Sequence, residues 1–565
     1  MKDILKKFGF LVLLVTTVTS CDLDGDLENP NQITVSGADV DLIMNGIQLD
    51  FADFFNAAHD RVNPLVRMEA MTGGFRYQTA NSPQDANGVW SSAYEDVLVN
   101  AETMITLAEE KGLTTHIAVG KILSAYVYLT LVDVFGDVPR TEALKGGEGN
   151  FNPVADGGES VYDYAITLLD EARTELAKTG TAAGGALSRD IYYGGNRARW
   201  NALANTLELK AQLNLSQVPA RKAGADARIT ALLTADLVDT EAENFTYKYS
   251  STTVPVSRHP LYRQYYDPIR GQAGGYIANY FLYELFQGKV DPVDPAVTVQ
   301  DPRWRYYFYR QVGSIAQALA VDPKSLGCAP GAPPQHYIDQ GVKMFCVFDP
   351  GFYGRDHGDG FGIPPDGPVL TAAGVYPAGG KIDNTAVTNA TFVGTTIQGD
   401  GANGAGIQPI FMSWFTDFMR AEFLARNGDA AGAKTAMNDG INKSITQIRN
   451  FATSKAQVLS PGREPSTTAY LAAVNFVYDN AANKLDVIGK EFYISAWGNG
   501  VEAYNIYRRT SAPRDLQPTL QTNPGPFYRS YVYPATYVNL NDNASQKDFN
   551  ATNKVFWDTN PDDLK

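Results

Sequence analysis

The chain is large, ordered in composition and acidic. Its 565 residues are 44% hydrophobic and 11% aromatic, and only 19% are charged, against about a quarter in typical soluble domains. A net charge of -15 would repel a phosphate backbone, so nucleic acid is excluded as an expected partner. A chain of this length buries an ample core, and neither a metal nor a disulfide is needed to hold it folded.

The first 20 residues have the pattern of a secretory signal peptide. A basic start with three lysines precedes an apolar run at residues 8–18, which is about half of the roughly 20 residues that span a bilayer. No later stretch is expected to come close to that length. Small residues before Cys21 resemble a bacterial lipobox, which implies cleavage before Cys21 and acylation of its thiol. The alternative is an ordinary signal peptide with a spare cysteine.

Residues 21–37 are predicted to form a flexible tether after the acylated cysteine. Their first part, residues 22–28, alternates carboxylates but lacks the spacing of an EF-hand loop, so no metal is predicted there. This acidic stretch resembles the export signal of surface lipoproteins.

The other two cysteines are Cys328 and Cys346, in a segment rich in Gly and Pro. We predict that they form a disulfide, since an exported protein meets an oxidising environment. Two buried thiols are the alternative. No second cysteine pair or histidine lies at zinc-ligand spacing, so neither a metal nor a cofactor is predicted.

Helical periodicity dominates the chain outside its middle. From residue 116 to 133 apolar positions recur every three or four residues, as in a helix with one buried face, and Gly136 and Pro139 end it. Similar patterns predict helices at residues 90–108, 161–176, 199–215, 409–426, 430–448, 467–483 and 487–507. They arrive largely as consecutive pairs, which favours a mainly α fold with a scaffold of tetratricopeptide-like helix pairs.

Residues 240–405 differ from the rest of the chain in composition and in periodicity. Gly, Pro and Thr rise there, and helical periodicity fades except at residues 276–286. We predict a large loop-rich insertion within a single domain at residues 38–565. Loops on a rigid frame are where binding sites usually lie.

Common catalytic signatures are missing from the sequence. It contains no His-Glu-x-x-His, Gly-x-Ser-x-Gly, Cys-x-x-Cys or Walker phosphate loop, and the Gly-x-Gly-x-x-Gly match at residues 399–404 lacks a βαβ context. A glycosidase needs only two carboxylates, so that class stays open. The cluster Asp-His-Gly-Asp at residues 356–359 is interpreted as a turn in which aspartates cap the backbone.

Aromatic residues gather in one part of the insertion. Between Tyr262 and Tyr309, 13 of 48 residues are aromatic, where the chain average gives about five. Core packing explains part of this excess, and a sugar-binding face would explain the rest, since rings offer a flat apolar surface. Strand alternation would send Trp304, Tyr306 and Phe308 to one side, and we expect at least one side to be accessible.

Several segments, taken in chain order, resemble the SusD/RagB lipoproteins. Those of the first half are residues 90–101, 125–139 and 199–207. Those that resemble the second SusD-like branch are residues 301–303, 354–359, 362–366, 376–380, 421–422, 502–504, 508–510, 533–534 and 556–558. Each segment alone is weak, but their order together is specific, and the resemblance covers nearly the whole chain after the signal.

The resemblance implies tetratricopeptide-like helix pairs that hold a variable, loop-rich ligand face. Members are not enzymes and need no cofactor. They bind glycan fragments, or peptides in some branches, and are anchored by lipid in the outer membrane, facing the exterior, over a SusC-like TonB-dependent transporter. The resemblance further implies scaffold roles for Trp200, Trp557, the cluster at residues 356–359, and Arg508 with Arg509.

Candidate ligand contacts rest on expected exposure, because the family's contacts come from variable loops. They are Phe75, Arg76, Tyr77, Trp90, Tyr262, Tyr265, Tyr266, Asp267, Arg270, Trp304 and Tyr306. A neutral glycan suits an acidic protein better than a charged one. The alternatives are capture of an oligopeptide and, less favoured, a surface glycoside hydrolase.

Overall fold

The computed structural model describes residues 39–72, 76–266, 275–325, 328, 331–359, 369–387, 392, 394, 396–561 and 563–565. Its first half contains α2 (Val40–Val62), α3 (Tyr77–Ala80), α4 (Asn87–Ser91), the π-helix η4 (Ser92–Leu98), α5 (Val99–Glu110), α6 (Thr114–Phe135), α7 (Gly158–Ala177), α8 (Arg197–Leu215) and α9 (Lys222–Leu232). The predicted signal peptide, Cys21 and the tether lie outside the described residues.

The second half begins with short helices and ends with long ones. They are α10 (Pro260–Tyr266), α11 (Asn279–Phe286), α12 (Trp304–Tyr307), α13 (Ile315–Val321), α14 (Gln335–Asp339), α15 (Ser413–Arg426), α16 (Ala430–Ser454), α17 (Thr467–Asn480), α18 (Lys484–Ser495), α19 (Gly500–Thr510) and α20 (Ala535–Leu540). The fold is mainly α, as predicted from the helical periodicity.

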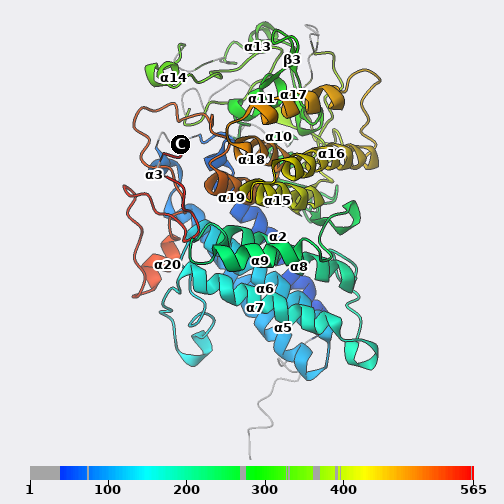
Figure 1. Ribbon diagram of the computed structural model, residues 1–565, viewed down its shortest axis with the longest axis vertical. Helices are drawn as coiled ribbons and strands as arrows, with labels where there is room; N and C mark the ends of the chain where they lie inside the picture. Colours follow the sequence, from blue (N-terminus) through cyan, green and yellow to red (C-terminus); the bar gives the residue numbers. More distant parts are fainter. Residues whose placement is uncertain are drawn as a thin grey trace, which may run out of the picture.

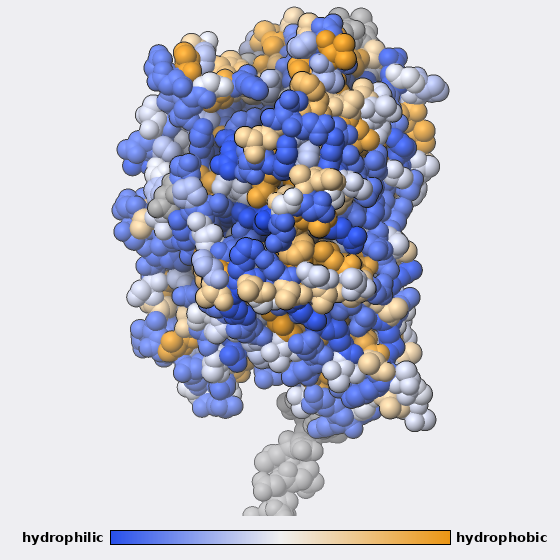
Figure 2. Space-filling model, in the orientation of Figure 1, coloured by the Kyte–Doolittle hydropathy of each residue, from blue (hydrophilic) through white to orange (hydrophobic). Residues whose placement is uncertain are grey.

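The two halves of the chain lie one above the other (Figure 1). Helices α5 to α9 form the lower half, and α15 to α19 lie above them. Neighbours in the chain pack as pairs, among them α6 with α7 and α15 with α16. A single main hydrophobic core includes buried residues from both halves. The outer face in Figure 2 is largely hydrophilic, with apolar residues in small groups.

Helix α6 is buried on all sides. Of the described helices it alone has the length and apolar composition to cross a membrane, but 94% of that apolar stretch lies inside the protein. The expectation that no stretch after the signal comes close to this length was therefore wrong. The expectation of one buried face was also too narrow, because α5, α7, α8 and α2 all pack against this helix.

Helix α2 joins the two ends of the chain. It packs against α5 and α6 of the lower half and against α19 near the C-terminus. Near its last turn, Nδ1 of His59 accepts a hydrogen bond from the backbone N–H of Gly500 at 2.7 Å. No side chain fits at position 500, because a Cβ there would lie 2.8 Å from the Cβ of Asn63. This close approach fixes the end of α2 against the start of α19.

The strands are short and form three antiparallel pairs. β1 (Phe245–Lys248) pairs with β6 (Ile407–Phe411), β2 (Lys289–Val290) with β3 (Thr298–Val299), and β4 (Phe308–Arg310) with β5 (Thr371–Ala373). The first of these pairs joins the two ends of the predicted insertion. The insertion is loop-rich, as expected, yet α10, α11 and α12 contribute many aromatic residues to the main core.

Candidate functional site

A pocket of about 290 Å³ opens where the end of α2 faces the start of α10. Its walls come from the last turns of α2, the segment Glu69–Thr72, α10 and Gly275 with Tyr276. The lining includes Thr72 and Gly275, which directly precede residues 73–75 and directly follow residues 267–274, and those two segments lie outside the described residues. One flank of each segment in which we predicted ligand contacts therefore lies at this pocket.

The pocket floor is tied together by backbone pairing between distant segments. Ala70 N–H donates to the carbonyl of Tyr276 at 2.8 Å, and Glu69 forms an antiparallel bridge with Ile277. Asn63, which follows α2, donates its amide N–H to Oε2 of Glu69 at 2.9 Å. The pocket is thus held by rigid elements rather than by loops alone.

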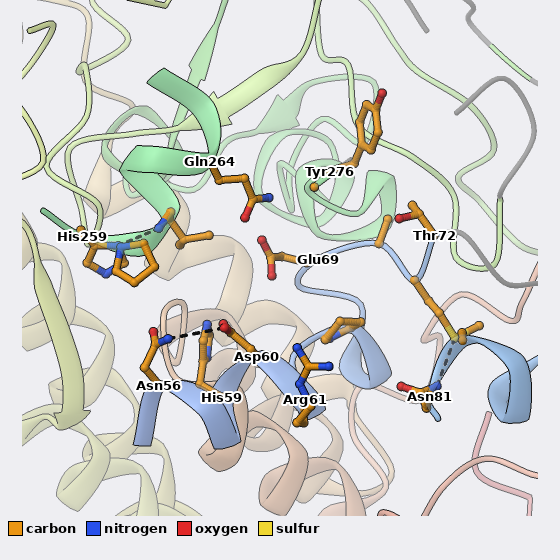
Figure 3. A pocket seen from close by; sticks show the side chains of 17 residues that line it. Asn56, His59, Asp60, Arg61, Glu69, Thr72, Asn81, His259, Gln264 and Tyr276 are labelled. Atoms are coloured by element: carbon orange, nitrogen blue, oxygen red, sulfur yellow. Dashed lines mark hydrogen bonds between the residues drawn. The ribbon is translucent and has the colours of Figure 1, made fainter. Parts of the chain in front are cut away.

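Polar side chains converge inside the pocket (Figure 3). Gln264 on α10 and Glu69 point toward one another from opposite walls. Asn56 and Asp60 lie one turn apart on α2, with Nδ2 of Asn56 3.4 Å from Oδ2 of Asp60. Gly275 has room for no side chain, since a Cβ there would overlap the amide of Gln264.

Burial shifts the titration of the acidic groups in the pocket. It raises the pKa of Asp60 to about 6, an effect that the charge of Arg61 partly opposes. It also raises the pKa of Glu69 to about 7, with a smaller contribution from the charge of Asp60. Near neutral pH Glu69 is therefore partly protonated and can both donate and accept hydrogen bonds, whereas Asp60 is largely ionised and accepts them.

Two histidines line the same pocket and remain neutral. Burial lowers the pKa of His59 to about 4, and burial with the proximity of His59 lowers that of His259 to about 3. In each ring Nδ1 accepts a backbone hydrogen bond, from Gly500 for His59 and from Leu261 for His259, so the proton resides on Nε2. Among the described residues, no group of three or more His, Cys, Asp or Glu could hold a metal ion.

The arrangement is suited to binding an uncharged polar ligand. Amide, carboxyl and imidazole groups supply hydrogen-bond donors and acceptors, and Tyr276 is the single phenol ring in the described lining. That ring points away from Glu69 in Figure 3, and the guanidinium of Arg355 covers it at 4.6 Å from the ring centroid. Hydrogen bonds, rather than stacking, would therefore provide most of the affinity of this pocket.

None of the predicted contacts of the first loop belongs to the described lining of the pocket. Phe75 lies outside the described residues. Arg76 is exposed and immediately precedes α3. Tyr77 is buried, and its hydroxyl lies 3.0 Å from Nη2 of Arg67 and 3.3 Å from Nε2 of His357. Tyr77 therefore faces the core and a different pocket near the C-terminus.

Trp90 packs against other rings of the protein. It is partly buried, with its ring centroid 4.4 Å from Tyr537 and 4.9 Å from Tyr94. Phe135 and Tyr533 complete this aromatic cluster. The cluster joins α4 to α20, and Trp90 is not part of the lining of the pocket in Figure 3.

The tyrosines of α10 are core residues. Tyr262, Tyr265 and Tyr266 are at most 4% exposed, and Tyr262 stacks on Tyr266 with ring centroids 4.4 Å apart. The hydroxyl of Tyr266 donates to the carbonyl of Ala373 at 2.9 Å. These rings anchor α10, while its neighbour Gln264 faces the pocket. Asp267 and Arg270 lie outside the described residues.

The predicted strand at residues 304–309, with one accessible side, was wrong. Residues 304–307 form the helical turn α12, β4 follows, and every residue from Trp304 to Tyr309 is buried. Trp304 is fully buried and has the guanidinium groups of Arg305 and Arg310 at 4.4 and 5.0 Å from its ring. Tyr306 donates its hydroxyl to Glu464 at 3.1 Å. The aromatic excess thus serves the core, because the long loops of the insertion need large side chains to cover them.

The segments assigned to the scaffold are buried and heavily bonded, which confirms that assignment. Asp356 accepts hydrogen bonds from Cys346 N–H and Gln517, both at 2.8 Å, and Gly358 takes a positive φ of 79°. Trp200 and Trp557 are fully buried. Cys328 and Cys346 form a disulfide with their Cα atoms 4.9 Å apart.

Sequence reasoning missed the residues that line the pocket. Its main polar side chains are Asn56, His59, Asp60, Arg61, Glu69, Asn81, His259 and Gln264. The helix that carries the first four was not predicted at all. One signal was present: apolar residues recur at helical spacing through residues 40–62, and Asn63 with Pro64 marks the end of that pattern directly after Asp60 and Arg61.

The comparisons with known proteins agree with this architecture. The sequence matches the second SusD-like family model, described as starch-binding and associating with the outer membrane, over residues 30–322 and 376–534. No curated protein sequence that was compared gave a match.

Solved structures share the fold at low sequence identity. A SusD/RagB family protein from Bacteroides thetaiotaomicron is 18% identical, with a TM-score of 0.61 over 90% of this chain and 95% of that one. A chitin-binding SusD homologue from Flavobacterium johnsoniae is 17% identical, with a TM-score of 0.59 over 91% and 99%. A SusD homologue from Bacteroides uniformis is 16% identical, with a TM-score of 0.59 over 92% and 99%. The family model covers most of the sequence and the helical scaffold matches throughout, and the chain therefore belongs to the SusD-like family of proteins associated with the outer membrane.

Proposed function

We propose that this protein is a cell-surface lipoprotein that captures an oligo- or polysaccharide and delivers it to a SusC-like TonB-dependent transporter, without cleaving it. The observation that carries the proposal is the polar pocket between α2 and α10, whose described lining comes largely from the helical frame. The starch-binding description of the family and the chitin-binding relatives support a glycan as the ligand.

The pocket favours a neutral glycan. Asp60 and Glu69 would repel a uronate or a sulfate, whereas sugar hydroxyls can donate to them and accept from Gln264 and Asn56. Because no exposed ring lies in the described lining, we expect a modest affinity. Oligomers of N-acetylglucosamine are neutral and carry both hydroxyl and amide groups, so they are the first ligands to test.

The proposed anchor makes a modest affinity sufficient. Acylation of Cys21, after cleavage of residues 1–20, would hold the protein in the outer membrane, with residues 21–37 as the tether. A tethered binding protein meets its partner at an effective concentration set by the tether length, in the millimolar range for a short flexible tether. Transfer to the transporter then needs no tight complex with the glycan.

The test is a titration of the purified protein with a panel of neutral oligosaccharides, followed by calorimetry. We expect at least one to bind, and Gln264→Ala to weaken binding by about fivefold, since one lost hydrogen bond between partly buried groups is worth about 1 kcal/mol. Gln287→Ala is the matched control, because Gln287 is also half-buried but lies outside the pocket.

The same experiment separates the proposal from its alternatives. Binding of extended peptides in place of every oligosaccharide would show a peptide-capture protein of the same family. New reducing ends during incubation with polysaccharide would show a glycoside hydrolase and would refute capture without cleavage. Unchanged binding in Gln264→Ala would remove the glycan from this pocket.

A further inference from the structure

A second pocket, of about 490 Å³, lies between the start of α8, strand β1 and the end of α16. It is distinct from the pocket between α2 and α10, and the two have no described lining residue in common. Helix α16 lies above α8 in Figure 1, so this pocket joins the two halves of the molecule. Its volume falls within the range of about 300 to 1,000 Å³ that is usual for small-ligand sites.

Its described lining carries three cationic side chains and one carboxylate. The cations are Arg199 from α8, Lys248 from β1 and Lys455 at the end of α16. The carboxylate is Glu241, whose Oε2 accepts a hydrogen bond from Nδ2 of Asn450 at 2.8 Å. This excess of positive charge stands out in a chain of net charge -15.

None of the three cations forms an ion pair within the described part of the chain, although most other basic groups there do. Lys455 instead lies over the ring of Phe451, with Nζ 5.3 Å from the centroid. Burial lowers the pKa of Lys455, and the nearby charge of Lys248 lowers it further. An anion between these ammonium groups would relieve both effects.

A buried hydroxyl adds an uncharged donor to the same wall. Tyr376 lines the pocket, is 1% exposed, and its hydroxyl has no hydrogen-bond partner among the described residues. Its ring is fixed between those of Phe451 and Tyr307, with centroids at 5.7 Å from each. A buried hydroxyl without a partner costs free energy, and a ligand oxygen would satisfy it.

We infer that this second pocket binds the carboxylate or sulfate group of an acidic saccharide. Arg199, Lys248 and Lys455 provide the charge, and the hydroxyl of Tyr376 donates a hydrogen bond. The saccharide part of this assignment rests on the proposed function, whereas the anion-binding part does not. The pocket between α2 and α10 would take a neutral sugar, so the two sites differ in the charge that they select.

The experiment is calorimetric titration of the purified protein with three probes and one matched control. The probes are a trisaccharide of galacturonic acid, a sulfated disaccharide derived from heparin, and inorganic sulfate, and the control is the methyl ester of the same trisaccharide. We expect at least one acidic saccharide to bind, its ester to bind at least tenfold more weakly, and the affinity to fall as salt rises. Arg199→Gln and Lys455→Gln should each weaken binding by about tenfold, as the loss of a charge-assisted hydrogen bond predicts.

Three more variants make the result specific. Tyr376→Phe removes only a hydroxyl that has no hydrogen-bond partner among the described residues, so it should weaken binding while leaving the unfolding midpoint unchanged or higher. Lys145→Gln removes one charge from an exposed loop residue outside the pocket and should have no effect. Gln264→Ala should also leave acidic-saccharide binding unchanged, which distinguishes failure here from failure of the proposed glycan site.

Three outcomes would overturn the inference. They are failure of both acidic saccharides to bind, equal binding of the ester and the acid, and full affinity in Arg199→Gln and Lys455→Gln. Inorganic sulfate that binds as tightly as the acidic saccharides would overturn the saccharide assignment.

Discussion

Arg509 on α19 forms a bidentate ion pair with Glu422 on α15. Its Nε and Nη2 lie 2.8 and 2.9 Å from the two carboxylate oxygens, and both residues are buried. The remaining nitrogen, Nη1, donates to Oδ1 of Asn214 on α8 at 2.8 Å. One guanidinium therefore holds three helices from both halves of the chain.

Replacing Arg509 should destabilise the protein strongly. Arg509→Met leaves Glu422 buried with only the half-buried Arg426 as its partner, and breaking a buried ion pair costs about 3 to 5 kcal/mol. Urea denaturation followed by circular dichroism measures this loss. Arg514→Met is the matched control: Arg514 pairs with Asp486 at the surface, so its loss should cost less than about 1 kcal/mol. Equal losses in the two variants would contradict the scaffold role of Arg509.

Trp304→Ala should lower the free energy of unfolding, and its effect should not be confined to ligand affinity. Trp304 is fully buried between two guanidinium groups, and removing a buried aromatic ring costs about 3 to 5 kcal/mol. Thermal unfolding beside glycan titration measures both effects. Phe151→Ala, at a side chain that is 73% exposed, should change neither. A Trp304→Ala protein of unchanged stability and lost affinity would restore the binding face at residues 304–309.

Glu69 should make the free energy of unfolding depend on pH. Burial, followed by the charge of Asp60, raises its pKa from 4.5 to about 7 in the folded protein. The folded state thus keeps a proton that the unfolded chain releases, so the free energy of unfolding falls as the pH rises between these two values. Glu69→Gln, which cannot ionise, should be close to the native protein near pH 4.5 and exceed it by about 3 kcal/mol at pH 8.

Urea denaturation at pH 4.5, 6 and 8 would test this dependence. Glu148→Gln is the control, because Glu148 is exposed outside the pocket. If Glu69→Gln were less stable than the native protein at pH 8, the carboxylate of Glu69 would be stabilising and its pKa would not be raised.

Reduction of the disulfide should loosen the loops around α14. The bond between Cys328 and Cys346 spans 18 residues, and closing a loop of this size stabilises a protein by about 2 to 4 kcal/mol. Dithiothreitol should therefore lower the urea midpoint of the native protein. A protein with Cys328→Ser and Cys346→Ser should show the lower midpoint from the start and no response to the reductant. A response in that double variant would assign the effect of reductant to another group.

The long helices were predictable because their apolar spacing is local information. Residues 161–176 and 199–215, predicted from periodicity, fall within α7 and α8 with small changes at the ends. The predicted helix at residues 487–507 is two helices, α18 and α19, because Asn499 caps a new helix after a turn at Trp497 and Gly498. A break of four residues does not disturb the periodicity enough to be seen in the sequence.

The pocket could not be predicted in the same way. Its residues come from α2, α10 and the segment after Arg67, and the pocket is held together by bonds between distant segments, such as that between Ala70 and Tyr276. The burial of Tyr262 and Trp304 was also not predictable from the sequence, because an aromatic-rich loop has the same composition whether it covers a core or lies open to solvent. The position of the two flanking loops was visible in the sequence, but the side chains that face inward were not.

The attachment of the last residues to the first helices has a consequence for how the protein is made. Asp133 on α6 is fully buried and accepts hydrogen bonds from Asn505 at 2.6 Å and from Trp557, eight positions before the last residue, at 3.1 Å. Tyr162 and Lys210 of the lower half also contact this carboxylate, so the lower half holds part of the cluster by itself. In a chain that is exported as proposed, the contacts from Asn505 and Trp557 would form only once those late residues have arrived, and the core around Asp133 would reach its full stability after passage.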